Sequence, residues 1–388
     1  MVPIRYNLRS LAVRKVTTVA TALGIGLVVG VLAISMMLSN GIKKTLGASG
    51  HDDVAIVLRK GSDNELGSTI EDANVGLLTT PTQVKGAGAG APAFVAEVVV
   101  VTAVEKLGAK GVTNLLVRGV NDDVLAFRPT VTLVEGRAPK PGVDEAIVGQ
   151  RVRGRFRGME LGQRFDIKKN RPVTVVGVFS DQGSSHESEV WVPLDTLRSS
   201  FGREGIRSSV RVRLSSPGAF ADYQRAVEQD RRLGLQAMRE TTYYEKQSEG
   251  TGLFITVIGT LVSVFFSLAA ILGAAITMYA AVASRSREVG ILRALGFSRF
   301  SILVAFVIES MMLSGLGGLV GLGAALALGG QKVSMMNFAS GSEVVFTFEP
   351  TPGIVLTGVV FSLVMGLLGG FLPALRAARV PPVVAMRG

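Results

Sequence analysis

Few residues in this 388-residue sequence have the types and spacing that catalysis requires. A phosphate-binding loop of the form G-x-x-x-x-G-K-[ST] needs a Gly-Lys pair, and the sequence contains none, so we do not expect it to bind ATP in that way. The two histidines, His51 and His186, lie among polar residues, and we predict that both are solvated rather than part of a Ser/His/Asp site. With no cysteine and two isolated histidines, we expect no catalytic residue, no metal site and no cofactor in this chain.

The charged residues in the middle of the chain are interpreted as surface residues. Five carboxylates are scattered over predicted turns and are expected to be solvated: Asp122, Asp123, Glu135, Asp144 and Glu145. A denser basic run is predicted to be a solvated strand face, with anionic headgroups or an acidic partner as the alternative: Arg151, Arg153, Arg155, Arg157, Arg164, Lys168, Lys169 and Arg171. The net charge of +11 does not indicate nucleic acid, because many Lys and Arg residues flank apolar spans.

Charge concentrates again between two long apolar segments, at 283–301. This stretch carries four arginines and one carboxylate: Arg285, Arg287, Glu288, Arg293 and Arg299. Apolar residues alternate with the arginines, so the stretch is amphipathic and can lie against a membrane or a partner protein. A short basic loop between two spans is expected on the cytoplasmic side.

Glu309 is the one carboxylate within an apolar span. It follows the start of that span by about two helical turns, roughly 12 Å at 1.5 Å per residue. An intramembrane carboxylate is costly and marks function by default. We favour a structural hydrogen bond or ion pair with an arginine of the preceding loop, because a proton relay would need further ionisable residues in the spans.

The elements around these residues describe an integral membrane α-helical protein with four transmembrane helices. We predict spans at 16–38, 253–284, 301–330 and 353–373, the last ending at Pro373, since each has the roughly 20 apolar residues that cross a bilayer. The first is expected to be a retained anchor rather than a cleaved signal peptide. Basic residues place three segments in the cytoplasm: the amphipathic segment 1–15, the loop 285–300 and the tail 374–388. Segment 331–352 is then expected to be an outer loop. Glycines at close-packing spacing are candidates for helix contacts: Gly26, Gly30, Gly317 and Gly321.

Residues 39–252 have the composition of a large extracytoplasmic α+β domain inserted between the first and second helices. Alternation predicts strands at 53–58, 94–104, 112–120, 131–134, 171–179, 188–192 and 209–214. Helices are predicted at 194–201 and 218–233, and loops at 85–92 and 181–189. The flanks 41–45 and 240–252 either extend the membrane helices as a stalk or are ordinary linkers.

Two motifs resemble those of a known family. The stretch R-S-R-E-V-G-I-L-R-A-L-G-F-S-R looks like the signature between the second and third helices of the FtsX-like, or MacB-type, permeases of ABC transporters. The ending G-G-F-L-P-A-L-R-A-A-R-V-P-P-V-V-A-M-R resembles the close of the same family, and the order of one helix, a large outer domain and three helices also matches. The outer domain resembles the family only in its general pattern.

The resemblance implies a permease in the bacterial inner membrane, as a homodimer or closely related heterodimer, with two copies of a separate ABC ATPase that holds ATP and Mg. It implies that a coupling helix is seated in the ATPase, and the matching residues are Arg285, Arg287, Glu288, Val289, Gly290, Ile291, Leu292, Arg293, Ala294, Leu295 and Gly296. It also implies that the outer domain is a periplasmic core domain of two α+β lobes on a helical stalk. MacB carries a fused nucleotide-binding domain ahead of the first span, whereas this sequence begins at the span, so we expect hydrolysis on a partner.

Three functions follow from this resemblance as hypotheses. ATP-driven closure of the ATPase would move the coupling helices together, and stiff helices would pass the displacement to the outer domains. The complex would export a small molecule, peptide or lipid with a periplasmic adaptor and an outer-membrane channel, or extract lipoproteins or lipids from the outer leaflet. The alternative is a signalling subunit that activates a cell-wall hydrolase and transports nothing. An outer-facing enzyme is disfavoured because the sequence offers no active site.

Overall fold

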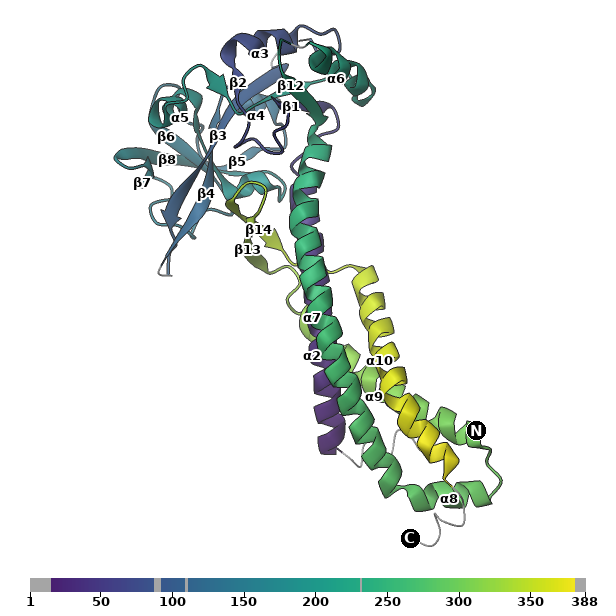
Figure 1. Cartoon of the computed structure of the whole chain (residues 1–388). Helices are drawn as coiled ribbons and strands as arrows, with labels where there is room; N and C mark the ends of the chain where they lie inside the picture. Colours follow the sequence, from purple (N-terminus) through teal and green to yellow (C-terminus); the bar gives the residue numbers. More distant parts are fainter. Residues whose placement is uncertain (1–14, 87–91, 109–110, 231, 381–388) are drawn as a thin grey trace. The chain divides into compact units, whose positions relative to one another are not determined.

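The computed structural model of the protein describes residues 15–86, 92–108, 111–230 and 232–380 (Figure 1). The predicted amphipathic segment 1–15 lies outside these residues except for Lys15, as do most of the 85–92 loop and the last eight residues of the tail. The described chain forms two compact units. The helical unit comprises 1–40, 253–331 and 348–388, and the outer unit comprises 41–252 and 332–347.

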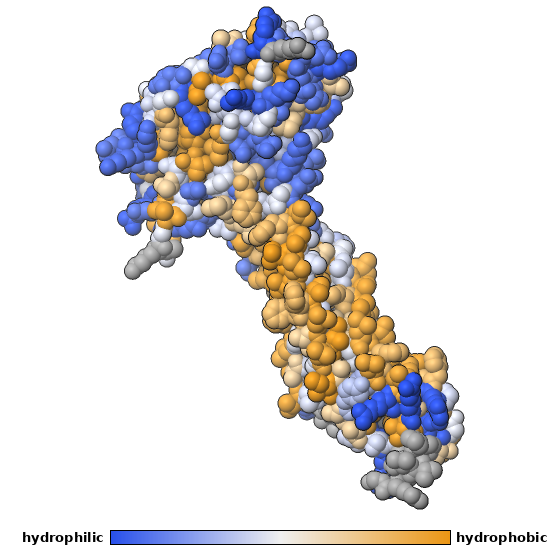
Figure 2. Space-filling view, viewed as in Figure 1, coloured by the Kyte–Doolittle hydropathy of each residue, from blue (hydrophilic) through white to orange (hydrophobic). Residues whose placement is uncertain are grey.

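Four of the described helices are long and apolar enough to cross a membrane, as the sequence predicts: α2 (Lys15–Gly47), α7 (Glu240–Ser284), α9 (Arg299–Leu326) and α10 (Pro352–Arg379). The short helix α8 (Ser286–Ala294) follows α7. Both α2 and α7 are longer than the predicted spans, because the flanks 41–45 and 240–252 are helical. Figure 2 shows a mostly hydrophobic surface along these helices and hydrophilic residues at the end that carries α8.

Helix α10 does not end at Pro373, contrary to the sequence prediction. Proline removes one backbone hydrogen bond and its ring crowds the carbonyl four residues earlier, here that of Gly369. The helix nevertheless continues to Arg379, and its last turns are held by packing. Pro373 itself is buried, and Ala374 and Ala377 belong to an apolar core with residues of α7, α8 and α9.

The outer unit is built on a ten-stranded sheet of order β12-β1-β11-β3-β4-β9-β6-β8-β5, with β7 paired to β8. Two neighbouring pairs are parallel, β4 with β9 and β6 with β8, and the others are antiparallel. The strands of this sheet are β1 (Val54–Arg59), β3 (Phe94–Glu105), β4 (Val112–Val120), β5 (Thr132–Gly136), β6 (Glu145–Gly149), β7 (Arg164–Lys168), β8 (Arg171–Ser180), β9 (Glu189–Pro193), β11 (Ser209–Arg213) and β12 (Leu235–Arg239). A separate pair joins β2 (Ile70–Glu71) and β10 (Ile206–Arg207).

Two of the apolar cores that cover the sheet hold longer helices against it. One joins β4, β6, β8 and β9 to α5 (Leu194–Phe201). The other joins β1, β11 and β12 to α3 (Asp72–Thr79) and α6 (Phe220–Gln229), which lie at that end of the sheet in Figure 1. Short helices at α4 (Val124–Phe127), η1 (Ser185–Ser188) and η2 (Pro217–Ala219) complete the unit. All seven predicted strands and both predicted helices are confirmed within a few residues, whereas β6, β7, β12 and α3 were not predicted.

The segment 331–352, predicted to be an outer loop, contains two regular strands. The chain forms a hairpin there, β13 (Lys332–Asn337) and β14 (Ser342–Thr347), and 332–347 belongs to the outer unit. The alternating sequence S-E-V-V-F-T is a strand pattern. Glu343 of β14 is almost completely buried.

Candidate functional sites: the basic helix α8 and a buried ionic cluster

Helix α8 is anchored at its start by a buried ion pair. Arg285 precedes the helix, and its Nη1 donates to both carboxylate oxygens of Glu309 in α9, at 3.1 and 3.0 Å. Both side chains are nearly inaccessible, and the guanidinium also lies over the ring of Phe306. The ion pair that we favoured for Glu309 is therefore present. A charged pair with two hydrogen bonds fixes orientation as well as position.

One side of α8 is packed and the other is exposed. Val289 is buried in a core with Met278, Val282, Ile302 and Phe306, and Gly290 beside it is also buried. The opposite side presents an exposed set from the predicted coupling residues: Arg287, Glu288, Ile291, Ala294 and Leu295. Leu295 is 72% exposed and Ile291 47% exposed. An apolar stripe with an arginine, turned away from its own core, has the composition of a protein interface.

The end of α8 is defined by backbone conformation. Gly296 has φ +94°, a left-handed conformation that favours glycine, and it follows the last turn of the helix. Arg293 donates to the carbonyl of Phe297 at 3.1 Å, and Leu292 is half-buried. The eleven predicted coupling residues therefore form one anchored helix with its cap, and Arg285, Val289 and Gly290 are its buried members.

The four glycines named for helix packing meet at one contact between α2 and α9. A Cβ on Gly26 would lie 2.8 Å from the carbonyl oxygen of Gly317, and a Cβ on Gly321 would lie 2.1 Å from that of Gly26. Gly30 faces Gly321 at 3.4 Å. Side chains at Gly26 and Gly321 would overlap backbone atoms, so the approach of these two helices requires glycine.

The outer unit holds a second candidate site, which we call the ionic cluster: Glu65, Glu97, Arg118, Arg128, Glu189, Arg211 and Glu240. Adjacent strands β11, β3, β4 and β9 bring four members together, and Glu240 is the first residue of α7. Arg118 donates to both oxygens of Glu189, at 2.7 and 2.8 Å. Arg211 donates to Glu240 at 2.8 Å and to Glu97 at 2.6 Å. The cluster thereby joins α7 to the centre of the sheet.

Charge compensation keeps the carboxylates of Glu65 and Glu240 ionised. Burial alone would raise the pKa of Glu65, but the guanidinium groups of Arg118 and Arg211 hold it well below its usual range. Burial likewise opposes ionisation of Glu240, and Arg128 and Arg211 lower its pKa. Breaking a buried pair leaves an uncompensated charge, which costs about 3–5 kcal/mol. The joint between sheet and helix is therefore costly to open.

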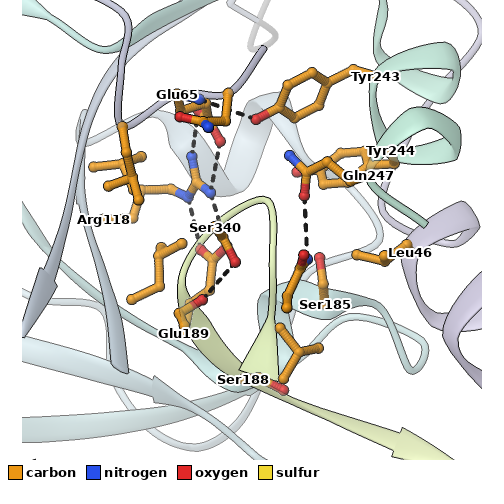
Figure 3. Close-up of a pocket in the computed structure, with 17 residues that line it drawn as sticks. Leu46, Glu65, Arg118, Ser185, Ser188, Glu189, Tyr243, Tyr244, Gln247 and Ser340 are labelled. Carbon is orange, nitrogen blue, oxygen red and sulfur yellow. Dashed lines mark hydrogen bonds and ion pairs between the residues drawn. The ribbon is translucent and has the colours of Figure 1, made fainter. Parts of the chain in front are cut away.

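A small cavity lies beside the ionic cluster, with Arg118 between Glu65 and Glu189 on one side (Figure 3). Its volume of about 30 Å³ suits a single water molecule. Polar residues, including Tyr243 and Gln247 of α7, and apolar residues both line it. A cavity of this size cannot receive an organic substrate.

The prediction that His186 is solvated was wrong. His186 is fully buried, its Nδ1 lies 2.7 Å from Oδ2 of Asp181, and its Nε2 lies 2.9 Å from the hydroxyl of Tyr244 in α7. Ser184 contacts Asp181 instead of Nε2, so these residues do not have the geometry of a nucleophile and its base. The loop at 181–189 can be buried because its polar groups are satisfied within it: Glu187 accepts from the backbone N–H groups of Asp181 and Gly183.

Two surface predictions also need correction. In the basic run, Arg151 is buried beside Glu187 at 3.0 Å, and 151–157 is a series of turns rather than a strand. Among the carboxylates expected to be solvated, Glu145 is buried, and its hydrogen bond from Arg137 lowers its pKa to about 2. In both cases the charge is compensated by a partner in contact with it, which is distant in the sequence for Arg151 and across a turn for Glu145.

Sequence reasoning did not find the ionic cluster. Along their strands Arg118 follows Val117, and Arg211 lies between Val210 and Val212; an arginine that alternates with valine normally indicates a solvated face. The available signal was weak: a glutamate or arginine within each of four strand-like segments. Among the described residues, no group of three or more His, Cys, Asp or Glu side chains could hold a metal ion.

Known families match most of the chain. The model of the MacB-like periplasmic core domain matches residues 16–230, and the model of the FtsX-like permease C-terminal region matches residues 260–382. The uncharacterized ABC transporter permease YknZ of Bacillus subtilis is 27% identical over 404 residues, which cover 99% of this chain and 98% of YknZ.

Other similar proteins are matched over a part of their length. The macrolide export ATP-binding/permease protein MacB of Burkholderia lata is 30% identical over 290 residues, which cover 70% of this chain and 41% of MacB. Among solved structures, the periplasmic region of MacB from Actinobacillus actinomycetemcomitans is 15% identical with a TM-score of 0.38, over 53% of this chain and 96% of that structure.

Proposed function

Because the chain belongs to the MacB-type, FtsX-like family of ABC transporter permeases, we propose that it is the membrane subunit of an ATP-driven complex and that α8 docks on a separate ABC ATPase. Two permease copies and two ATPase copies form the complex, with both termini and α8 in the cytoplasm and the outer unit in the periplasm. ATP and Mg are held by the ATPase.

The observation that carries this proposal is the two-sided character of α8. Its buried side is fixed by the Arg285–Glu309 ion pair and by Val289, while Arg287, Ile291 and Leu295 face outward. A rigidly mounted helix transmits displacement better than a mobile loop. Its exposed apolar residues gain free energy when a partner's groove covers them.

We further propose that α7 carries the motion of α8 to the outer unit. Helix α7 is continuous from Glu240 to Ser284, and α8 begins two residues later at Ser286. At its other end, Glu240 is held by Arg211 and Arg128, and Tyr244 contacts His186. Because charged hydrogen bonds fix α7 to the sheet, displacement of α7 moves the sheet as well.

The transported substrate is proposed from the relatives and from the spans. MacB of Burkholderia lata is named a macrolide exporter, and the spans of this chain contain no ionisable residue besides Glu309, which is paired. The spans therefore offer no route for a polar substrate through their centre. We propose export, or extraction from the outer leaflet, of a peptide, small molecule, lipid or lipoprotein, with a periplasmic adaptor and an outer-membrane channel in the export case.

The proposal is tested by co-expressing the chain with the ABC ATPase encoded beside its gene. Aspartate at Ile291 and Leu295 places charge on the outward side of α8, and we expect at least a tenfold loss of ATPase co-purification, since interface anchors contribute about 2 kcal/mol or more. Val134→Asp is the matched control, because Val134 is an exposed aliphatic residue of β5 in the outer unit. Equal ATPase binding by all variants would contradict docking through α8.

A further inference from the structure

The β13–β14 hairpin is a second physical connection between the two units. The chain leaves α9 at Leu326, forms the hairpin within the outer unit, and returns to α10 at Pro352. The two connecting segments are held to each other, because the N–H of Gly330 donates to the carbonyl of Phe348 and the N–H of Phe348 donates to that of Gln331, both at 3.1 Å. The connection is thus a paired ribbon rather than two free loops.

Glu343 of β14 is the main charged contact of the hairpin with the sheet. Its carboxylate accepts from Lys106 Nζ at 2.7 Å, from Thr113 Oγ1 at 2.7 Å, and from Arg155. Lys106 and Thr113 belong to the β3–β4 hairpin, and Arg155 lies in the turns after β6. The Glu343 side chain is 5% exposed. Burial opposes its ionisation, but the hydrogen bonds from Lys106 and Thr113 lower its pKa to about 2.

Side chains of the sheet also bind the main chain of the hairpin. Arg151 donates to the carbonyl of Val345 at 2.6 Å, and Ser188 accepts from the N–H of Val345 at 3.1 Å. Asn114 donates to the carbonyl of Gly341 at 2.9 Å. The turn of the hairpin reaches the cavity beside the ionic cluster, where Ser340 lies near Arg118 and Glu189 (Figure 3).

The helices on either side of the hairpin both contact α8. Helix α9 holds α8 through the Arg285–Glu309 ion pair, and α10 contributes Ala374 and Ala377 to the core that buries Val289. Displacement of α8 therefore acts directly on the two helices that lead to the hairpin, without passing through α7.

We propose that the β13–β14 hairpin is a second transmission element, which carries motion of α9 and α10 to the sheet of the outer unit through Glu343. This inference rests on the proposed function and adds to it a route separate from α7. Undocking the hairpin removes this route and weakens the coupling of the outer unit to the ATPase, while ATPase binding at α8 stays intact.

The test uses spin labels on the full chain in nanodiscs with its ATPase, since a sequence without cysteine permits unique labelling. Cysteines at Val112 and Met336, both exposed, report whether the hairpin is docked. Cysteines at Val134 and Leu319, also exposed, report movement between the units on addition of ATP, Mg and vanadate. Glu343→Lys faces Lys106 and Arg155 with a like charge, and Asp195→Lys, an 88% exposed carboxylate of α5, is the matched control.

We expect Glu343→Lys to change the 112–336 distance and to lose at least half of the nucleotide-dependent change in the 134–319 distance. Hydrolysis should stay within twofold of the native rate, and Lys106→Glu combined with Glu343→Lys should restore the change in the 134–319 distance.

A full 134–319 change with an undocked hairpin would show that the hairpin only covers the sheet, and an unchanged 112–336 distance would show that Glu343 is not the anchor. If the native protein binds no ATPase or shows no change, the proposed function fails and this inference fails with it.

Discussion

A single ion pair, Arg285 with Glu309, determines how α8 is mounted. Both side chains are buried, so neither charge has water to replace its partner. The loss of Glu309 alone is expected to be more damaging than the loss of both partners, because Arg285 then keeps a buried charge that has lost two hydrogen bonds, although it also donates to Glu288 at 3.3 Å. The pair therefore serves mainly to hold the start of α8 in place against α9.

We predict that Glu309→Gln destabilises the protein by about 1–3 kcal/mol and weakens ATPase binding, because the buried Arg285 loses a charged acceptor of two hydrogen bonds. The double variant Arg285→Met with Glu309→Gln should recover most of the loss. Thermal unfolding of the full chain in detergent and ATPase co-purification measure the two effects. Equal stability of the single and double variants would contradict the uncompensated-charge explanation.

At this scale the sequence predicted some partners and missed others. Glu309 was identifiable because a carboxylate stands out in an apolar span, and its arginine lay one loop away. Arg118 and Arg211 were not identifiable, since their partners come from other strands and from α7. Sequence periodicity reports which face of a strand a residue occupies, but it does not report whether that face is covered.

Among the elements, the α2–α9 contact depends on glycine at defined positions. We predict that Gly321→Ala destabilises the helical unit by about 1–3 kcal/mol, because its Cβ would overlap the carbonyl oxygen of Gly26. Gly323→Ala is the control on the same helix, since a Cβ there has no neighbour within 4 Å. Thermal unfolding in nanodiscs should separate the two variants, and identical melting would argue against a tight contact.

Elements with a strong pattern were predictable, and elements defined by their neighbours were not. Strands β3 and β4 and the four long helices have long apolar or alternating runs. The hairpin β13–β14 was mistaken for a loop, because its length and its charges fitted a connection between spans. Its strand conformation depends on the sheet residues that bind it, such as Arg151 and Asn114.

At the scale of the whole molecule, a fall in pH should lower the folding stability of the outer unit. The pKa values of Glu145 and Glu343 are about 2, against an ordinary value of 4.5, so the unfolded chain takes up protons first as the pH falls. Their contribution to stability is complete above about pH 4.5 and is lost between about 4.5 and 2. The lowered pKa values of Glu65, Glu97 and Glu240 add to the same trend.

Trp191 is the natural reporter of this transition. It is the single tryptophan, is buried, and donates to Glu189 of the ionic cluster at 2.8 Å. We predict that its emission shifts to longer wavelength as the pH falls from about 4.5 to 2, and that Glu343→Gln weakens this pH dependence. Emission that stays constant to pH 2 would contradict the role of these carboxylates in stability.

The hairpin also sets the order in which the protein can be made. Lys106 and Arg155 are synthesised well before Glu343, and α7, α8 and α9 lie between them in the chain. When Gly252 has left the ribosome, the ten strands of the sheet have been made, but Val345 of β14, which Arg151 and Ser188 bind, has not. Domains generally fold as they emerge, but this one has to wait for the insertion of its third span. Until then the residues of the outer unit that the hairpin covers remain exposed to chaperones and proteases.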